Sequence, residues 1–228
     1  EQKKRDKEET TNAPVEPAKP EQNVQEKSPE TDVKSNKEDG VKPEEINTEQ
    51  QAKQPRTIAE ASQEIADWVK GKIEAREAFT NRNLFDMADK AFGGTQGQGV
   101  YSVKDAYDAM ELGVNQYILQ AEVFHDYLKR GNPVQARHMI TRLLELVSLL
   151  PTQANRTEEQ DEFQQFSTPP ALSFVAAWVA NMDKADVVLE PSAGIGGLIV
   201  WAKALGATTI VNELSPRRSE VLKQMGFD

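Results

Sequence analysis

The chain has 228 residues, enough for one or two domains, and its 27 basic and 37 acidic side chains give a formal net charge of −10. This charge makes the surface as a whole a poor match for nucleic acid, so any such contact needs a local basic patch. With no cysteine and only two histidines, the sequence favours neither a disulfide framework nor a metal site. Because no apolar run approaches the length of a membrane span and no signal-peptide core is present, we expect a cytoplasmic protein without a membrane partner.

Residues 1–56 have the composition of a disordered tail or linker. They contain 11 basic and 14 acidic side chains and no aromatic residue, since the first aromatic residue of the chain is Trp68. Such a segment cannot bury enough apolar surface to offset the entropy that ordering costs. A binding tail is the alternative, but the near balance of charges favours a solvated segment.

Residues 57–150 are predicted to form a small all-helical domain. The first helix starts at a capping box, Thr57 with Glu60, and carries apolar residues at helical spacing as far as Ile73. The other helices are expected over residues 84–92, 102–128 and 134–150. Gly131 and Pro133 end the third of these four helices.

Two features of this helical region resemble binding sites. The glycine-rich segment GGTQGQG, residues 93–99, lacks the Gly-Lys-Ser/Thr of a Walker loop, so we interpret it as a flexible connection between helices. A modest basic edge is the second feature, formed by His125, Lys129, Arg130, Arg137, His138 and Arg142. Most such clusters are solvated surface, and contact with DNA or with a protein partner is the alternative.

After a polar linker at residues 151–165, the pattern changes to strands alternating with helices. A strand of the buried type is expected over residues 186–190 and a second strand over 208–212, with helices over 169–182, 198–205 and 216–225. Ser215 caps the last helix and Pro216 occupies its first position. The strand–helix–strand–helix order predicts that the two strands are parallel neighbours.

The segment VVLEPSAGIGG, residues 187–197, suggests a ligand site at the carboxyl ends of these strands. Its glycines let a ligand approach the backbone, and Glu213 at the tip of the second strand can accept both hydroxyl hydrogens of a ribose. Glu190 beside the loop disfavours a pyrophosphate but suits an ammonium group. The third position of a dinucleotide fingerprint would be Ile199, so S-adenosylmethionine is favoured over NAD. A tight turn with an exposed flanking acid is the alternative without a ligand.

The residues LEPSAGIGG, 189–197, resemble the first motif of class I S-adenosylmethionine-dependent methyltransferases, and more narrowly that of N6-adenine DNA methyltransferases. Upstream, QFSTPP at residues 165–170 resembles the Phe-x-Thr-Pro segment of the same group, whose backbone touches the cofactor. Glu213 matches the family's ribose-binding acid. The resemblance covers about residues 163–228 and implies an α/β fold, with the first two strands of an incomplete Rossmann-like methyltransferase domain over residues 166–228.

The cofactor that the resemblance implies is S-adenosylmethionine. Its implied binding residues are Phe166, Thr168, Pro169, Glu190, Pro191, Ser192, Ala193, Gly194, Ile195, Gly196, Gly197, Glu213 and Leu214. Glu190 and the region of Thr168 would hold the methionine end, and the loop from Ser192 to Gly197 would pass under the sugar and the methionine. No metal site is expected.

Adenine methylation needs a further motif, Asn/Asp-Pro-Pro-Tyr/Phe, which binds the target base in this family. The only Pro-Pro pair is Pro169–Pro170, which follows Thr168 and precedes the first strand. We therefore assign no catalytic residue and expect a truncated chain, inactive alone, whose incomplete sheet exposes apolar surface. The first residue, Glu1, also suggests a piece of a longer protein, in which DNA contacts the missing C-terminal part or the helical domain.

Other functions stay open. A fragment of an RNA or protein-glutamine methyltransferase would share the same loop. A non-catalytic interaction module is a different class, in which the helical domain binds a protein partner. A helical domain ahead of a methylase also resembles the large multidomain proteins of phages and conjugative plasmids that serve in anti-restriction or DNA processing.

Overall fold

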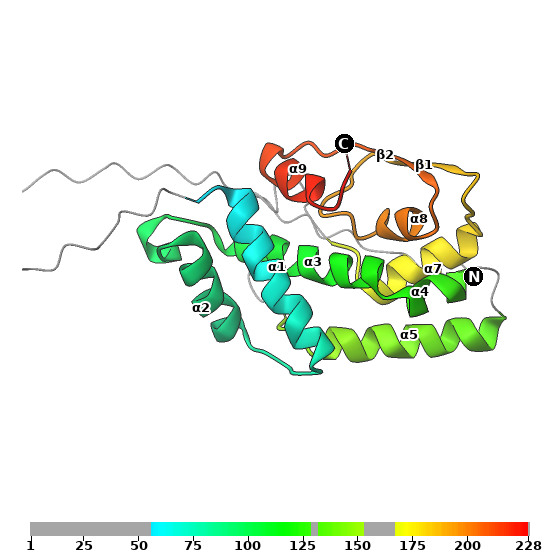
Figure 1. Cartoon of the computed structure of the whole chain (residues 1–228), viewed down its shortest axis with the longest axis horizontal. Helices are drawn as coiled ribbons and strands as arrows, with labels where there is room; N and C mark the ends of the chain where they lie inside the picture. Colours follow the sequence, from blue (N-terminus) through cyan, green and yellow to red (C-terminus); the bar gives the residue numbers. More distant parts are fainter. Residues whose placement is uncertain (1–55, 129–131, 153–166, 228) are drawn as a thin grey trace, which may run out of the picture. The chain divides into compact units, whose positions relative to one another are not determined.

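A computed structural model of the chain describes residues 56–128, 132–152 and 167–227 (Figure 1). Residues 1–55 of the predicted tail, residues 153–165 of the predicted linker and Phe166 lie outside the described residues. The described residues are mixed α/β and mostly helical, with two parallel strands. None of their helices has both the length and the apolar composition of a membrane span.

The first part of the chain is helical, as predicted. Its helices are α1 (Ile58–Glu74), α2 (Asn81–Phe92), the short 3-10 helix η1 (Gln96–Gln98), α3 (Val103–Gln120), α4 (Glu122–Leu128) and α5 (Pro133–Ser148). The capping box at Thr57 is confirmed, because its hydroxyl accepts the N–H of Glu60 and the Glu60 carboxylate accepts the N–H of Thr57. An equivalent box at Ser102 and Asp105 starts α3.

Several helix boundaries differ from the prediction by one to three residues, and two differences have a clear physical cause. The second helix begins at Asn81 rather than at residue 84, because Thr80 and Asn83 form a capping box in which an amide replaces the usual carboxylate. The long helix predicted over residues 102–128 is broken at Ala121, where ψ is 89°. The break turns the ring of Phe124 edge-on to Trp201, with 6.2 Å between ring centroids. Burial of this ring therefore overrides the continuous helical pattern.

The connection at residues 93–99 contains more structure than the sequence predicts. Gly93, with φ of 77°, ends α2 in the left-handed region, and the helix η1 follows within the loop. The Thr95 hydroxyl and the Gln98 side chain cap this single turn, so local hydrogen bonds fold part of the connection.

The second part of the chain has the predicted strand–helix–strand–helix order. Its elements are α7 (Pro170–Ala180), β1 (Val187–Glu190), α8 (Val200–Ala204), β2 (Thr208–Val211) and α9 (Pro216–Lys223). The strands are parallel, as predicted, and Val187 pairs with Thr208 in a register that brings Glu190 opposite Val211. Ser215 caps α9, because its hydroxyl accepts from the N–H of Arg218.

One face of the sheet is covered and the other is open. Val188 and Val211 pack against the hydrophobic core, whereas Val187, Leu189 and Ile210 are 66%, 63% and 51% exposed. The prediction that β1 is a buried strand is therefore wrong for one of its two faces. The exposed apolar surface that we expected is present on that face.

Helix α3 contacts elements of both parts of the chain. It packs against α1 and α2 on one side, and it also contacts α8 and α9 (Figure 1). The indole of Trp201 on α8 is fully buried between the rings of Phe124 and Phe174, and its N–H donates to the Ser173 hydroxyl at 2.8 Å. One hydrophobic core thus includes residues of both regions, and their division into separate domains stays a prediction.

Candidate cofactor site

The glycine loop after β1 is tied to the end of β2 by the backbone and by one side chain. The N–H of Ala193 donates to the carbonyl of Asn212 at 2.8 Å, and the Asn212 side-chain amide donates to the carbonyl of Pro191 at 3.0 Å. The N–H of Asn212 in turn donates to the carbonyl of Glu190. These bonds hold the loop at the carboxyl edge of the sheet, where ligands bind in open parallel sheets.

Glu213, two residues beyond the end of β2, turns its half-buried carboxylate toward this loop. One carboxylate oxygen accepts the N–H of Gly194 at 2.7 Å, and the other accepts the N–H of Ser215 at 2.9 Å. A carboxylate offers about four acceptor positions, so two remain for further donors. The side chain is thus fixed in place and still able to accept two hydroxyl hydrogens.

A second carboxylate lies at the same edge of the sheet. Glu190 is the last residue of β1 and is half-buried, and its carboxylate accepts the N–H of Ser192 at 3.0 Å. With Glu213 it makes this edge of the sheet negatively charged. Such an edge attracts a cation or a hydroxyl-bearing ligand and repels a phosphate.

The glycines of the loop have different roles. Gly194 and Gly196 have φ of 56° and 86°, which is the left-handed region, and both face α9. A Cβ on Gly194 would lie 2.9 Å from a guanidinium nitrogen of Arg218, and one on Gly196 would lie 3.2 Å from Leu222. These two glycines therefore allow close packing as well as the turn. Gly197 lacks both constraints, because its φ is not positive and its Cβ would make only an ordinary contact.

The segment predicted to touch the cofactor lies beside the loop. The carbonyl oxygen of Thr168 is 3.6 Å from the position of a Cβ on Gly197, and the Ser167 hydroxyl donates to the carboxylate of Glu111 on α3. Pro169 immediately precedes α7 and is exposed. The structure thus brings together the two segments on which the sequence analysis depends.

The remaining predicted residues differ in what they offer a ligand. The side chains of Ala193 and Ile195 are buried in the core, so only their backbone groups can reach a ligand. Pro191 and Ser192 are exposed, and Leu214, beside Glu213, is 75% exposed.

Two residues that were not predicted from the sequence as site residues contact the glycine loop, Asn115 of α3 and Arg218 of α9. The side-chain amide of Asn115 donates to the carbonyl of Ile195 at 2.8 Å. Arg218 lies against Gly194, and its Nε is 3.6 Å from a carboxylate oxygen of Asp108 on α3. A sequence signal was present, because Lys104, Asp108 and Asn115 repeat at helical spacing among apolar residues.

Charged groups are buried where α3 meets α9. The ammonium of Lys104 lies 2.5 Å from Asp108, and both side chains are almost fully buried, as is Arg218. Burial raises the pKa of Asp108 to about 6, although attraction to Lys104 and Arg218 opposes the shift. A second pair joins the same helices at their edge, with Arg217 Nε 3.0 Å from Asp105. Such buried pairs specify how the two helices fit together.

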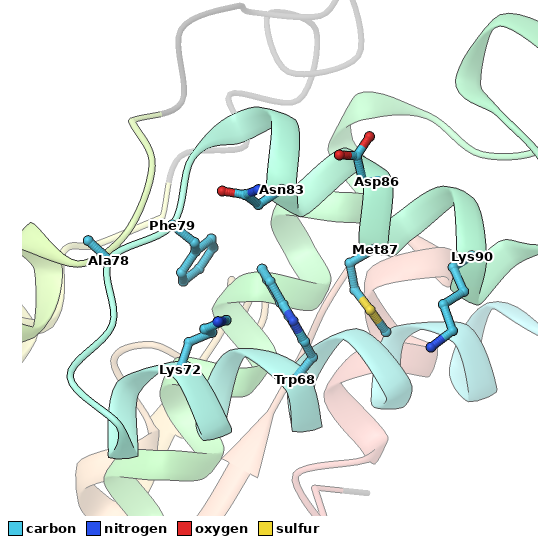
Figure 2. A pocket seen from close by; sticks show the side chains of 8 residues that line it. All are labelled: Trp68, Lys72, Ala78, Phe79, Asn83, Asp86, Met87 and Lys90. Atoms are coloured by element: carbon cyan, nitrogen blue, oxygen red, sulfur yellow. The ribbon is translucent and has the colours of Figure 1, made fainter.

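A separate pocket lies between α1 and α2, and Figure 2 shows the side chains around it. Its volume is about 410 Å³, and its lining residues are Trp68, Lys72, Ala78, Phe79, Asn83, Asp86, Met87 and Lys90. Lys72 is paired with Glu77, and the rings of Trp68 and Phe79 meet edge-on at 4.8 Å. The pocket contains none of the predicted binding residues.

Comparison of the chain with protein-family models, with curated proteins and with solved structures finds no match. The geometry of the glycine loop, its two carboxylates and its supports on α3 is therefore the basis for any assignment.

Proposed function

We propose that residues 167–227 bind S-adenosylmethionine and form the cofactor-binding part of a Rossmann-like methyltransferase of the N6-adenine DNA type. The observation that carries the proposal is the Glu213 carboxylate, fixed by the N–H groups of Gly194 and Ser215 at 2.7 and 2.9 Å. Its remaining acceptor positions suit the two hydroxyl groups of a ribose.

The charge at this edge of the sheet supports S-adenosylmethionine rather than a dinucleotide. Glu190 and Glu213 favour a ligand that carries an ammonium and a sulfonium, and they disfavour a pyrophosphate. Helix α8 has only five residues, so its N-terminus offers a weak dipole for phosphate binding. The exposed side chain of Leu214 provides an apolar surface for a flat base next to the ribose position.

The adenine-type assignment rests on the resemblance of LEPSAGIGG and QFSTPP, together with the contact between Thr168 and Gly197. The motif that binds the target base does not occur in the 228-residue sequence. The proposal for these residues is therefore limited to cofactor binding. That adenine receives the methyl group is inferred only by analogy with the family.

Calorimetric titration of the full chain with S-adenosylmethionine, S-adenosylhomocysteine and NAD tests this proposal. We expect the first two to bind and NAD to bind more weakly. Because Glu213→Ala removes two hydrogen bonds to a charged acceptor, it should weaken binding by about 100-fold or more. Glu220→Ala, which removes an exposed carboxylate from α9, is the matched control and should leave the affinity unchanged.

A second variant separates the ligand contact from the support of the loop, because Glu213 serves both. Gly197→Ala adds one methyl group where the fold has room for it, so the protein should be at least as stable as the unaltered chain. If the ligand lies against this backbone, the methyl group should weaken binding by about tenfold. Tighter binding of NAD, or absence of binding at millimolar S-adenosylhomocysteine, would contradict the proposal.

A further inference from the structure

The carbonyl group of Ile195 is held by a side chain from the helical part of the protein. Asn115 of α3 is 5% exposed, and its amide donates to this carbonyl at 2.8 Å. The N–H at the other end of the same peptide unit, that of Gly196, donates to the carbonyl of Ala193 at 2.8 Å. Both polar groups of the peptide between Ile195 and Gly196 are therefore fixed.

This peptide lies in a loop segment that contains two glycines with positive φ. It joins Ile195 to Gly196, and both Gly196 and the preceding Gly194 are in the left-handed region, where glycine costs little steric strain. A buried carbonyl without a donor loses the hydrogen bond that water would otherwise give it. The Asn115 amide therefore acts together with the Gly196–Ala193 hydrogen bond to hold one orientation of this peptide.

A second connection from α3 reaches the same loop through α9. Arg218 lies against Gly194 and is attracted to Asp108, which is seven residues before Asn115 and on the same side of α3. Arg217 is paired with Asp105 of α3 as well. Helix α3 thus holds the glycine loop through Asn115, and it holds α9, which packs against the glycines of the loop, through Asp105 and Asp108.

We infer that α3 pre-organises the glycine loop for ligand binding and that Asn115 is a positioning residue of the site. The inference rests on the proposed function, because the ligand is the S-adenosylmethionine assigned above. A loop that is ordered before binding saves the ligand the cost of ordering it. The helical part of the chain therefore contributes to affinity without touching the ligand.

The test compares Asn115→Ala with Gln116→Ala in the full chain. Gln116 is the next residue of α3, is 9% exposed, and exchanges hydrogen bonds with Gln63 of α1 at 2.8 and 3.0 Å. Each substitution removes one buried amide from the same helix, but only Asn115 contacts the loop. Two measurements are made on each variant: hydrogen exchange of peptides that cover residues 193–197 without ligand, and the affinity for S-adenosylhomocysteine.

We expect Asn115→Ala to speed amide exchange in residues 193–197 at least tenfold and to weaken S-adenosylhomocysteine binding about tenfold. Gln116→Ala should lower the unfolding temperature comparably and change neither quantity. If Asn115→Ala fails to fold, Asn115→Leu replaces it, because leucine fills a similar volume, favours a helix and has no donor.

Unchanged loop exchange in both Asn115 variants, or equal loss of affinity in Gln116→Ala, would overturn the inference. If the unaltered chain binds no S-adenosylhomocysteine, the proposed function fails, while the exchange measurement still decides whether Asn115 holds the loop. The two proposals can therefore fail separately.

Discussion

The helical part, residues 57–150, and the α/β part, residues 167–227, differ in how completely they cover their apolar side chains. Leu84, Leu112 and Leu143 of the helical part are fully buried. In the α/β part, Leu189 and Ile210 are more than half exposed on the open face of the sheet. Parallel sheets are normally covered on both faces, so the open face is the unusual feature.

The difference shows which contacts hold the α/β part in place. Its covered side depends on α3, through the core around Trp201 and the buried charges at Asp108 and Arg218. The candidate site lies in that supported part, since Asn115 holds the loop from the same helix. The helical part therefore provides the rigid support on which the candidate site is built.

The largest expected effect comes from breaking the buried charges that join the two parts. Arg218→Ala leaves Asp108 beside one cation instead of two and should lower the free energy of unfolding by about 3–5 kcal/mol. Arg137→Ala, which removes an exposed arginine from α5, should change it by less than about 0.5 kcal/mol. Urea denaturation measures both variants, and equal losses would mean that the buried charges do not join the parts.

Matched leucine substitutions test the comparison itself. Leu84→Ala removes a fully buried side chain and should cost about 2–5 kcal/mol. Leu189→Ala removes an exposed one and should cost less than about 1 kcal/mol. The same denaturation experiment compares them, and a large loss for Leu189→Ala would show that the open face is covered in solution.

A pair of glycine substitutions gives effects of opposite sign. Gly196→Ala forces a residue with a side chain to a φ of 86° and against Leu222 and Phe227, so it should cost about 1–3 kcal/mol. Gly71→Ala, inside α1 with open space around it, should stabilise the protein by about 0.4–1 kcal/mol. Thermal unfolding of both variants checks the signs, and stabilisation by Gly196→Ala would contradict the packing of α9 on the loop.

The last expected effect is a dependence on pH. Because the folded-state pKa of Asp108 is raised to about 6, the folded protein binds more protons than the unfolded chain between about pH 4 and 6. The stability of the unaltered protein relative to Asp108→Asn should therefore fall as the pH rises through this range and level off above it. Denaturation at several pH values measures the difference, and a rise over this range would contradict the raised pKa.

Local sequence signals predicted much of the fold. The hydroxyl caps at Thr57, Ser102 and Ser215 and the order of strands and helices near the C-terminus depend on neighbouring residues, and these predictions are confirmed. The break at Ala121 was missed because it depends on a ring contact between Phe124 and a distant residue, Trp201.

The candidate site could be predicted only in part, for the same reason. Glu190, Glu213 and the glycines are recognisable because they lie at or just beyond the ends of two consecutive strands, and the proposed nucleoside site would use them together. The position of Asn115 among the apolar residues of α3 signals a buried polar group, but its partner is a carbonyl 80 residues away, so no local pattern indicates its role at the loop. The composition of β1 alone did not indicate its exposed side, because a strand covered on one face or on two can have the same apolar residues; only the expectation of an incomplete sheet did.

The most direct test of the account is hydrogen exchange of the full chain with and without saturating S-adenosylmethionine, resolved by peptide. We predict that the ligand slows exchange in peptides covering residues 187–199 and 208–215. Peptides of α1 and α2, which line the separate pocket (Figure 2), should exchange at unchanged rates. Protection confined to that pocket, or no protection at any peptide, would contradict the assignment of S-adenosylmethionine to the glycine loop.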